Sequence, residues 1–388
     1  MNYNGTTPQE PPRLAGRTNG LNHDGTTPQE LPPLARRTNG LSPEPAEPGR
    51  LILVTGGGGY IGSVLTERLL DRGYRVRILD RLYWGRKPLA RVLDRIELVE
   101  ADVRDMPASA LDGVEGVIHL AGLSNDPTAE YDPEANWQMN AIATETLARN
   151  CVYRDVERLV FASSCSLYDG LPPGMHDEMA PIVPRGAYAT SKRYGEEALL
   201  ALVGEGLCPV ILRNGTVYGY SPRMRFDLVV NTFVKDALLR GELMLHGGGW
   251  MWRPLVDVQD VSDAMIAVLE APSEIVRGEI FNVLHSNYQI RELAMLVAGS
   301  VQLLGKSVTL REAPTPRLTR DYECSNTKLA SRLGFQPSRS VVEAIDSILA
   351  SIDLDDKAML SDPRFYNIRW LELLSELTPQ IDHYRAAL

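Results

Sequence analysis

Short apolar runs separated by amphipathic stretches fill the chain from position 51 onward. The runs LILVT, IELVE, GVIHL and RLVFAS have the length of strands and begin at residues 51, 96, 116 and 158. The stretch 60–72 carries its apolar residues on one face, as a helix requires, and ends before Gly73. A further strand is expected over 74–79, directly before Asp80. Strands that alternate with helices predict an α/β fold with a parallel sheet wound on both faces.

The first 49 residues differ from the rest of the chain. Residues 4–21 (NGTTPQEPPRLAGRTNGL) and 24–41 (DGTTPQELPPLARRTNGL) are near-duplicates at a spacing of 20 residues. Two copies are too few for a stacked repeat fold. The segment is rich in Pro, Gly, Thr and Asn and has few large apolar residues, so we predict that 1–49 is a disordered tail. A docking peptide for a partner is the alternative.

Glycines at three positions follow the first predicted strand. Gly56 permits a tight turn, Gly59 lets the backbone approach a pyrophosphate, and Gly62 lets the helix pack closely on the strand. The start of that helix, at Tyr60 and Ile61, then offers free N–H groups to phosphates. This order of strand, turn and helix predicts a dinucleotide-binding site; a merely glycine-rich turn is the alternative.

Two further positions bear on the dinucleotide. Asp80 ends the second strand, where it can accept hydrogen bonds from ribose hydroxyls and would repel a 2′-phosphate, so we predict NAD rather than NADP. Arg81 follows directly and could weaken that preference by attracting a phosphate. The small residues after the strand GVIHL allow the cofactor to lie against the backbone at Leu120, Ala121 and Gly122.

The segment YATSK places Tyr188 and Lys192 four positions apart, on one face of a helix. A lysine ammonium beside a phenol is expected to lower the pKa of the phenol. A tyrosine tuned in this way can exchange a proton with a sugar hydroxyl. Ser164 ends the strand RLVFAS, where it can hydrogen-bond the reacting oxygen. The alternative is that Tyr188 is a packing aromatic residue on its helix.

Composition removes several other functions. The formal net charge of -10 gives no basic face for nucleic acid, and no apolar run reaches the length of a membrane span. The N-terminus lacks the pattern of a signal peptide. The four cysteines include no CxxC pair, which argues against a zinc site, and no metal is expected. We therefore expect a cytoplasmic enzyme and interpret His119, His246 and His285 as structural.

The segments TGGGGYIG, HLAG, SSCSLYDG, YATSK and RPLVDVQDV together resemble the extended short-chain dehydrogenase/reductase family, within it the NAD-dependent epimerase/dehydratase group. The resemblance covers roughly residues 51–345. It implies a Rossmann-type doubly wound sheet and a smaller C-terminal α/β substrate domain. The resulting boundaries are 50–215 for the mainly NAD-binding part, 216–350 for the mainly substrate-binding part, and 351–388 for a helical extension. The resemblance also implies a homodimer and a nucleotide-diphosphate sugar as substrate.

The resemblance assigns roles to individual residues. It implies a catalytic triad of Ser164, Tyr188 and Lys192. Tyr188 and Lys192, together with Asn140, would also bind the cofactor. Asn140 would support the lysine through water, unless it is only a polar residue of its helix. Asp102 and Val103 would reach the adenine, unless Asp102 caps the next turn. Predicted substrate contacts, besides Ser164 and Tyr188, are Ser124, Thr216, Asn231, Arg253 and Arg320.

For Asn231 the expected contact is the nucleotide diphosphate, and for Arg253 a phosphate held by its bidentate fork. Arg320 would contact ribose or phosphate. Each of these three could instead be an ordinary surface residue.

Two positions depart from the family pattern. Related dehydratases carry an Asp-Glu pair directly after the catalytic Ser or Thr, and related decarboxylases carry the glutamate. Here these positions are Cys165 and Ser166, so dehydration and decarboxylation are disfavoured. The first hypothesis is therefore NAD-dependent epimerisation of a nucleotide-sugar through a keto intermediate. A nucleotide-keto-sugar reductase or dehydrogenase is the alternative, and a non-catalytic NAD-binding scaffold is a more remote one.

Overall fold

A computed structural model describes residues 49–315, 320–353 and 356–387. All of them belong to one compact unit, residues 40–388. The duplicated segments of the predicted tail lie outside the described residues.

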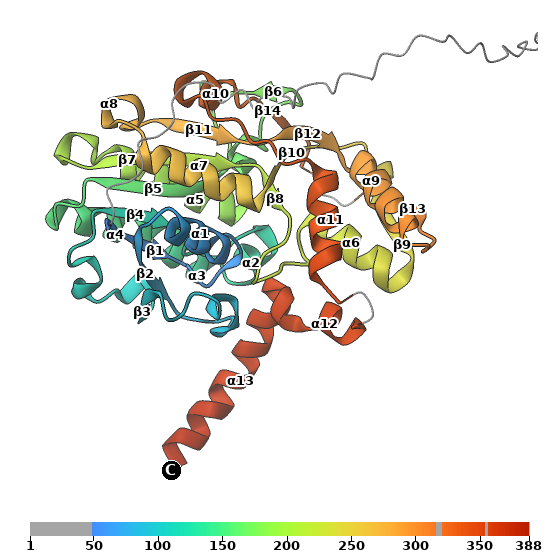
Figure 1. Cartoon of the computed structure of the whole chain (residues 1–388), viewed down its shortest axis with the longest axis horizontal. Coiled ribbons are helices and arrows are strands. Elements are labelled where there is room, and N and C mark those ends of the chain that lie inside the picture. The colour runs from blue at the N-terminus through green and yellow to red at the C-terminus, as the bar shows by residue number, and fades with distance from the viewer. Residues whose placement is uncertain (1–48, 316–319, 354–355, 388) are drawn as a thin grey trace, which may run out of the picture. The chain divides into compact units, whose positions relative to one another are not determined.

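A seven-stranded parallel sheet forms the centre of the fold (Figure 1). Its strand order is β11-β7-β5-β4-β1-β2-β3. The chain therefore winds outward in both directions from β1 and β4, which makes their carboxyl ends the expected ligand position. The strands are β1 (Leu51–Thr55), β2 (Arg75–Asp80), β3 (Ile96–Glu100), β4 (Gly116–His119), β5 (Arg158–Ser164), β7 (Cys208–Asn214) and β11 (Ile280–Val283).

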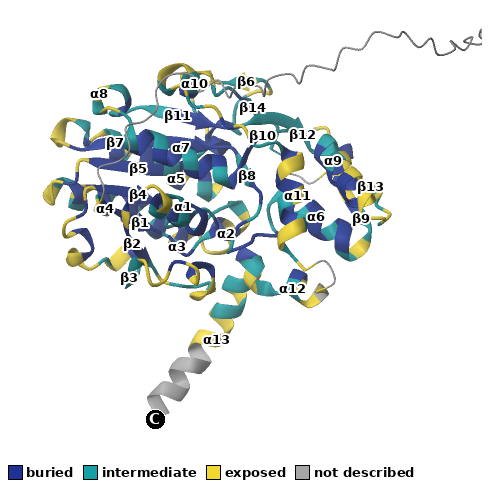
Figure 2. Ribbon diagram, in the orientation of Figure 1, coloured by how far each residue is buried: buried dark blue, intermediate teal, exposed yellow. Residues whose placement is uncertain are grey.

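Helices cover both faces of this sheet, which is why its central strands are apolar on both sides (Figure 2). In β1, Ile52 and Val54 pack toward one helical layer, whereas Leu51 and Leu53 pack toward the other. The first layer contains α1 (Tyr60–Asp71) and α7 (Val258–Glu270). The second layer contains α4 (Ala143–Tyr153) and α5 (Gly186–Leu200), preceded by α2 (Asp126–Tyr131) and α3 (Pro133–Trp137). The doubly wound α/β fold predicted from the sequence is confirmed.

A smaller α/β part follows β7. The chain leaves the central sheet at the end of β7 and passes to a smaller sheet through Gly215. A Cβ there would lie 2.8 Å from the Pro254 carbonyl oxygen, so only glycine allows this close passage. The small sheets are β12-β10-β8 and β13-β9, joined to helices α6, α9 and α11 by their own apolar cluster. The elements are β8 (Thr216–Tyr218), β9 (Glu242–His246), β10 (Trp252–Asp257), β12 (Ser286–Gln289), β13 (Thr309–Ala313), α6 (Val229–Arg240), α9 (Ile290–Leu303) and α11 (Val341–Ser351).

Short elements complete the described fold. Strands β6 (Met175–His176) and β14 (Glu323–Cys324) pair with each other in parallel. Helices α8 (Ser273–Val276) and α10 (Thr327–Leu333) lie beside β11, at the outer edge of the central sheet.

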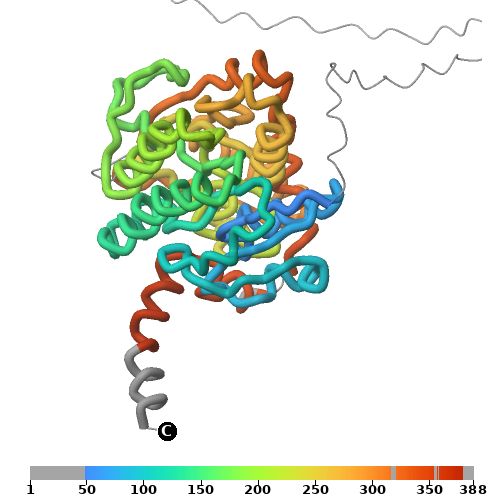
Figure 3. Tube along the Cα trace, turned by 90° about the vertical axis from the view of Figure 1, so that its left-hand side faces the viewer, coloured from blue at the N-terminus to red at the C-terminus, as the bar shows by residue number. Residues whose placement is uncertain are grey.

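The C-terminal extension contains two helices, α12 (Lys357–Ser361) and α13 (Asn367–Ala387). The first turn of α13 lies against the body of the fold, and the helix then leads away from it (Figure 3). Trp370 anchors this start by donating its indole N–H to the Tyr83 carbonyl at 2.5 Å. Although α13 has 21 residues, no helix within the described ranges is apolar enough over its length to span a membrane.

Candidate active site

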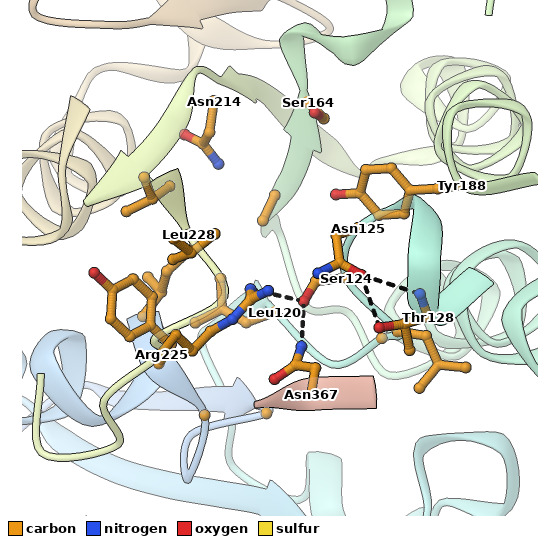
Figure 4. Close-up of a pocket in the computed structure, with 18 of the residues that line it drawn as sticks. Leu120, Ser124, Asn125, Thr128, Ser164, Tyr188, Asn214, Arg225, Leu228 and Asn367 are labelled. Carbon is orange, nitrogen blue, oxygen red and sulfur yellow. Dashed lines mark hydrogen bonds between the residues drawn. The ribbon is translucent and has the colours of Figure 1, made fainter. Parts of the chain in front are cut away.

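A cleft opens at the carboxyl ends of the parallel strands and reaches into the smaller α/β part (Figure 4). The glycine-rich turn after β1 lines one end. The residues at the ends of β5 and β7 line another part of the cleft, and Ser164 and Asn214 face its opening. The smaller part and the C-terminal extension contribute the remaining wall, including Thr216, Arg223, Arg225, Leu228, Arg320, Asn367 and Leu371.

The glycine-rich turn is shaped for close approach of a ligand. Gly56 has φ +75°, and a Cβ on it would lie 2.8 Å from the Ala121 nitrogen. A Cβ on Gly62 would lie 2.6 Å from the Gly57 Cα, because helix α1 passes directly over the turn. No side chain caps the start of α1 at Gly59, so its first N–H groups stay available to an anion. The turn therefore fits a dinucleotide diphosphate, as the sequence predicted.

The adenosine end of the site adjoins this turn and is lined by Asp80, Val103, Leu120 and Ala121, among others. The Asp80 carboxylate accepts hydrogen bonds from the backbone N–H groups of Gly58 (2.9 Å) and Leu82 (2.7 Å). Burial raises its pKa, and the two hydrogen bonds act against this shift. Asp80 is therefore held at the end of β2, where the sequence placed the ribose contact.

Arg81 and Asp102 interact with each other in this region. Their side chains form an ion pair at 2.7 Å, so the phosphate-attracting role considered for Arg81 is countered by a carboxylate. Asp102 also accepts the backbone N–H of Arg104 at 2.9 Å, which makes it the cap of a short 3₁₀ turn. Burial opposes ionisation of Asp102, but the hydrogen bonds from Arg104 hold its pKa below the usual range. Val103 lines the pocket, and Asp102 caps the turn that carries it.

Ser164, Tyr188 and Lys192 meet in the cleft. Ser164 is the last residue of β5, and its hydroxyl accepts the Ser166 N–H at 3.1 Å, which fixes its orientation. Tyr188 and Lys192 lie on one face of α5, which begins at Gly186. Figure 4 shows the Ser164 and Tyr188 side chains projecting into the same part of the cleft. The structure thus brings together the three residues that the sequence assigned to catalysis.

Charge at this triad differs from the sequence expectation. The Lys192 ammonium donates to the Ala162 carbonyl at 2.9 Å and lies 4.7 Å from the centre of the Phe161 ring. Burial lowers its pKa to about 8. Burial also raises the pKa of Tyr188, and Arg320 acts in the opposite direction. The pKa of Tyr188 is therefore raised rather than lowered as expected, because desolvation of the phenolate outweighs the positive charges of Arg320 and Arg225.

Asn140 supports the site from below rather than lining it. It lies in a π-helical turn between α3 and α4, a feature that often marks functional positions. Its side chain accepts the Leu123 N–H and donates to the Leu123 carbonyl, both at 2.8 Å. It also donates to the Ser191 hydroxyl at 3.3 Å, one residue before Lys192. Asn140 thus positions the backbone after Gly122 by direct hydrogen bonds.

The predicted substrate residues divide into two groups. Ser124, Thr216 and Arg320 line the cleft as expected, together with Ser164 and Tyr188. Asn231 and Arg253 do not line it.

Asn231 is fully buried and joins loops of the two parts of the fold. It accepts the Gly219 N–H at 3.1 Å and donates to the Tyr60 hydroxyl at 3.1 Å and the Arg225 carbonyl at 2.9 Å. Both amide N–H groups and the amide oxygen of Asn231 are thus engaged inside the protein, and its side chain does not line the cleft.

Arg253 is similarly engaged. Its guanidinium donates to the carbonyl oxygens of Trp252 and Arg320, and burial lowers its pKa. Arg320, which reaches the cleft, pairs with Asp126. Arg253 therefore holds the segment that carries Arg320.

Several lining residues were not identified from the sequence. Arg225 pairs with Asp227 at 2.9 Å and donates to the Ser124 hydroxyl at 2.9 Å (Figure 4). Asn367, from the C-terminal extension, donates to the same hydroxyl at 3.0 Å. The segment SPRMRFD, with two arginines and an acid after β8, was the available signal for Arg225. No comparable signal marked Asn367.

The two positions after Ser164 are packing positions. Cys165 and Ser166 are both buried. Asp126, whose charge acts on Tyr188, is paired with Arg320 rather than free in the cleft.

His119 is buried and hydrogen-bonds the hydroxyls of Thr55 (2.6 Å) and Thr144 (3.0 Å). Burial lowers its pKa to about 3, so it is a neutral structural residue. In the described part of the chain, no three His, Cys, Asp or Glu side chains are grouped to hold a metal ion.

Comparison with known proteins identifies the family. The sequence model of the NAD dependent epimerase/dehydratase family matches residues 52–283. A putative UDP-glucose 4-epimerase of Methanocaldococcus jannaschii is 30% identical over 308 residues, which cover 77% of this chain and 97% of that protein. The solved UDP-glucose 4-epimerase of Thermus thermophilus, in complex with NAD, is 28% identical with a TM-score of 0.67 and matches 78% of this chain and 100% of its own. The dTDP-glucose 4,6-dehydratase DesIV of Streptomyces venezuelae, solved with NAD bound, is 27% identical with a TM-score of 0.69 and matches 78% of this chain and 97% of its own.

These matches confirm the family, the α/β fold and the NAD cofactor predicted from the sequence: the chain belongs to the NAD-dependent epimerase/dehydratase family.

Proposed function

We propose that the protein is an NAD-dependent nucleotide-sugar enzyme and that its reaction is epimerisation. The observation that carries the proposal is the site itself. Ser164, Tyr188 and Lys192 share a cleft with a dinucleotide cradle, whereas Cys165 and Ser166 are buried side chains without carboxylates. The relatives include UDP-glucose 4-epimerases and a dTDP-glucose dehydratase, so a nucleotide-sugar is the substrate class that they support.

The chain's own groups suit reversible proton transfer at a sugar hydroxyl. Tyr188 in its phenolate form accepts the hydroxyl proton and later returns it, while Ser164 donates a hydrogen bond to the reacting oxygen. NAD, when bound, supplies reversible hydride transfer at the carbon that bears this oxygen. Arg320 and Arg225 both act to lower the pKa of the Tyr188 phenol, opposing the effect of burial. Because the hydride returns to the sugar within the same turnover, NAD is not consumed.

Polar residues that line the cleft are the proposed substrate contacts. Ser124, Thr216 and Arg320 line the cleft and are suited to hold the nucleotide-sugar. The ion pair between Arg320 and Asp126 would have to adjust if Arg320 contacts phosphate.

The alternative is a reductase or dehydrogenase that exchanges cofactor in each cycle. It would use the same Ser164, Tyr188 and Lys192. Asp80 at the ribose position and the pairing of Arg81 with Asp102 both disfavour the 2′-phosphate of NADP. The nucleotide that remains bound after purification therefore distinguishes the two.

The test has two stages. The purified protein is denatured and the released nucleotide measured, and the protein is then screened against UDP- and dTDP-sugars without added cofactor by proton NMR. We expect near-stoichiometric NAD and interconversion of two epimers, which Tyr188→Phe abolishes. Loss of water from the substrate would show a dehydratase, and consumption of added NADPH would show a reductase; either result would overturn epimerisation.

The proposed enzyme is a cytoplasmic homodimer. Helices α4 and α5 lie side by side on one face of the sheet, which suits a homodimer built across them. Light scattering on an eluting size-exclusion peak tests this: the mass of one chain would contradict it. The four cysteines are free thiols, which suits a reducing, cytoplasmic environment.

A further inference from the structure

Arg223 is a buried cation with few protein partners. It lies in the loop after β8, and only 3% of its surface is exposed. Its guanidinium donates one hydrogen bond, to the Asn367 side-chain oxygen at 2.5 Å, and its Nε has no partner. Across the described residues, no carboxylate forms an ion pair with it. Asp227 and Asp80 act on this charge from beyond ion-pair distance. A buried charge without a direct ion pair is costly, so this arrangement favours binding of an anion.

Other buried arginines of the protein show what a structural guanidinium looks like here. Arg213 pairs with Glu196 at 2.7 Å. Arg225 pairs with Asp227, and Arg158 donates to three backbone carbonyls and to the Ser273 hydroxyl. Arg223 differs from all three because most of its donors have no acceptor among the described residues.

The position of Arg223 indicates which anion it meets. Arg223 lines the main cleft and a neighbouring pocket, and its guanidinium lies 3.6 Å from the centre of the Trp84 ring. Trp84 lines these two pockets and also the adenosine pocket. Gly56 and Gly59 of the glycine-rich turn also line both the main cleft and the adenosine pocket. Residues shared by the two pockets mark the junction between them. A dinucleotide with its adenosine beside Asp80 and its reactive end beside Tyr188 must place its diphosphate at this junction.

We propose that Arg223 binds the diphosphate of the dinucleotide cofactor, opposite the start of helix α1, and that Asn367 of the C-terminal extension positions it. The planar fork of arginine matches a diphosphate, and stacking on Trp84 fixes its plane. The diphosphate of the nucleotide-sugar has the same chemistry. The junction position favours the cofactor, and this assignment holds whichever reaction the enzyme catalyses.

Binding measurements on the full chain, freed of bound nucleotide, test the role of Arg223. We expect Arg223→Gln to weaken NAD and ADP by about 10- to 100-fold, the loss typical of a hydrogen-bonded charge, and to leave adenosine within about twofold. Arg223→Lys retains the charge and should recover part of the affinity. Arg86→Gln is the matched control, because Arg86 lies on the neighbouring loop, is exposed, and pairs with Glu100 away from the pockets.

UDP, titrated in the presence of NAD, separates the two diphosphate sources. An unchanged UDP affinity in Arg223→Gln supports the proposal. A loss of affinity confined to UDP would assign Arg223 to the substrate. Affinities equal to those of the wild type for every ligand would show that Arg223 is structural. Equal losses for adenosine and ADP would show a general defect of the pocket. Each of these three results would overturn the proposal.

Variants of Asn367 test the positioning role. Asn367→Ala should weaken NAD binding by about 3- to 10-fold, because the guanidinium loses its one acceptor. Asn367→Asp keeps an acceptor but places a carboxylate on Arg223, so we expect it to weaken NAD binding more than alanine does. A purely structural hydrogen bond would give the reverse order, with aspartate closer to the wild type, and that order would contradict the positioning role.

Discussion

Replacing Lys192 with methionine should make the protein inactive and, near neutral pH, more stable. The side chain is buried, and its ammonium has one hydrogen bond, to the Ala162 carbonyl at 2.9 Å. Glu196, the nearest acidic group that acts on it, is itself paired with Arg213. The folded protein therefore carries a charge at position 192 that is poorly compensated, and Met has similar length without the charge.

The size of the effect follows from the pKa of Lys192. Burial lowers it from 10.5 to about 8, which corresponds to roughly 3 kcal/mol against folding with the charged form. Loss of the hydrogen bond to Ala162 returns about 1 kcal/mol. Lys192→Met should therefore raise the free energy of unfolding by about 2 kcal/mol at pH 7. The cost is fully present below about pH 8 and disappears as the pH rises to 10.5, because in that window the unfolded chain binds the proton that the folded chain has lost.

Urea unfolding of nucleotide-free wild type and variant at pH 7 and pH 10 measures this difference, and other titrating groups cancel in the comparison. We expect the advantage of the variant at pH 7 to shrink or reverse at pH 10. Turnover should fall by at least about 100-fold, the usual contribution of a group in proton transfer. A variant that is less stable than wild type at pH 7, or a difference independent of pH, would refute the assignment of Lys192 as an uncompensated buried charge.

Three further outcomes can be checked with the same protein. Tyr188→Phe should abolish turnover while its bound NAD content, measured after denaturation, stays at the wild-type level; residual turnover above about 1% would contradict its role in proton transfer. Gly62→Ala should lower NAD affinity and should lower the free energy of unfolding by about 1–3 kcal/mol, because its Cβ would lie 2.6 Å from the Gly57 backbone. A calorimetric titration with NAD that is equal to that of the wild type would disprove the clash. Burial raises the pKa of Asp257 to about 7 from 3.8, so wild type should lose stability relative to Asp257→Asn as the pH rises from 4 to 7; parallel stability curves would count against this.

The fold was predictable because local signals and burial agree. Strand β1 is buried at every position, and four of its five residues are apolar, so its pattern predicts a strand between two helical layers. Helix α1 begins at Tyr60 as predicted and ends at Asp71, one residue earlier than the pattern suggested. The change of sheets at Gly215 was not predictable, because it depends on the approach of Pro254 from a distant strand.

The site was predictable where its chemistry lies in short motifs. Ser164, Tyr188 and Lys192 come from such motifs, and the structure places all three in the cleft. Residues at the substrate side were harder, because whether a polar side chain faces the ligand or the interior depends on its neighbours. Asn231 was expected at the diphosphate, yet it is occupied by Gly219, Tyr60 and Arg225.

The C-terminal extension shows the limit of sequence reasoning most clearly. Asn367 is 144 residues from Arg223 and 243 from Ser124, and it hydrogen-bonds both. Only the folded chain brings these positions together, since no periodicity or spacing links them. The extension is thus part of the wall of the cleft, although it follows the segment that resembles the family.

The way buried charges are paired separates structural from ligand-binding groups in this protein. The charges of Arg213 and Glu196 compensate each other inside the protein. The Glu196 carboxylate also accepts a hydrogen bond from the Ser163 hydroxyl at 2.5 Å, and both side chains of the pair are almost fully buried. Lys192 and Arg223 are equally buried but face the cleft with one protein acceptor each. Such cations weaken the free protein and gain most when an anion with acceptor groups enters. The same uncompensated charge therefore lowers the stability of the free protein and raises its affinity for the nucleotide. When either charge is removed, the free energy of unfolding should rise and nucleotide affinity should fall.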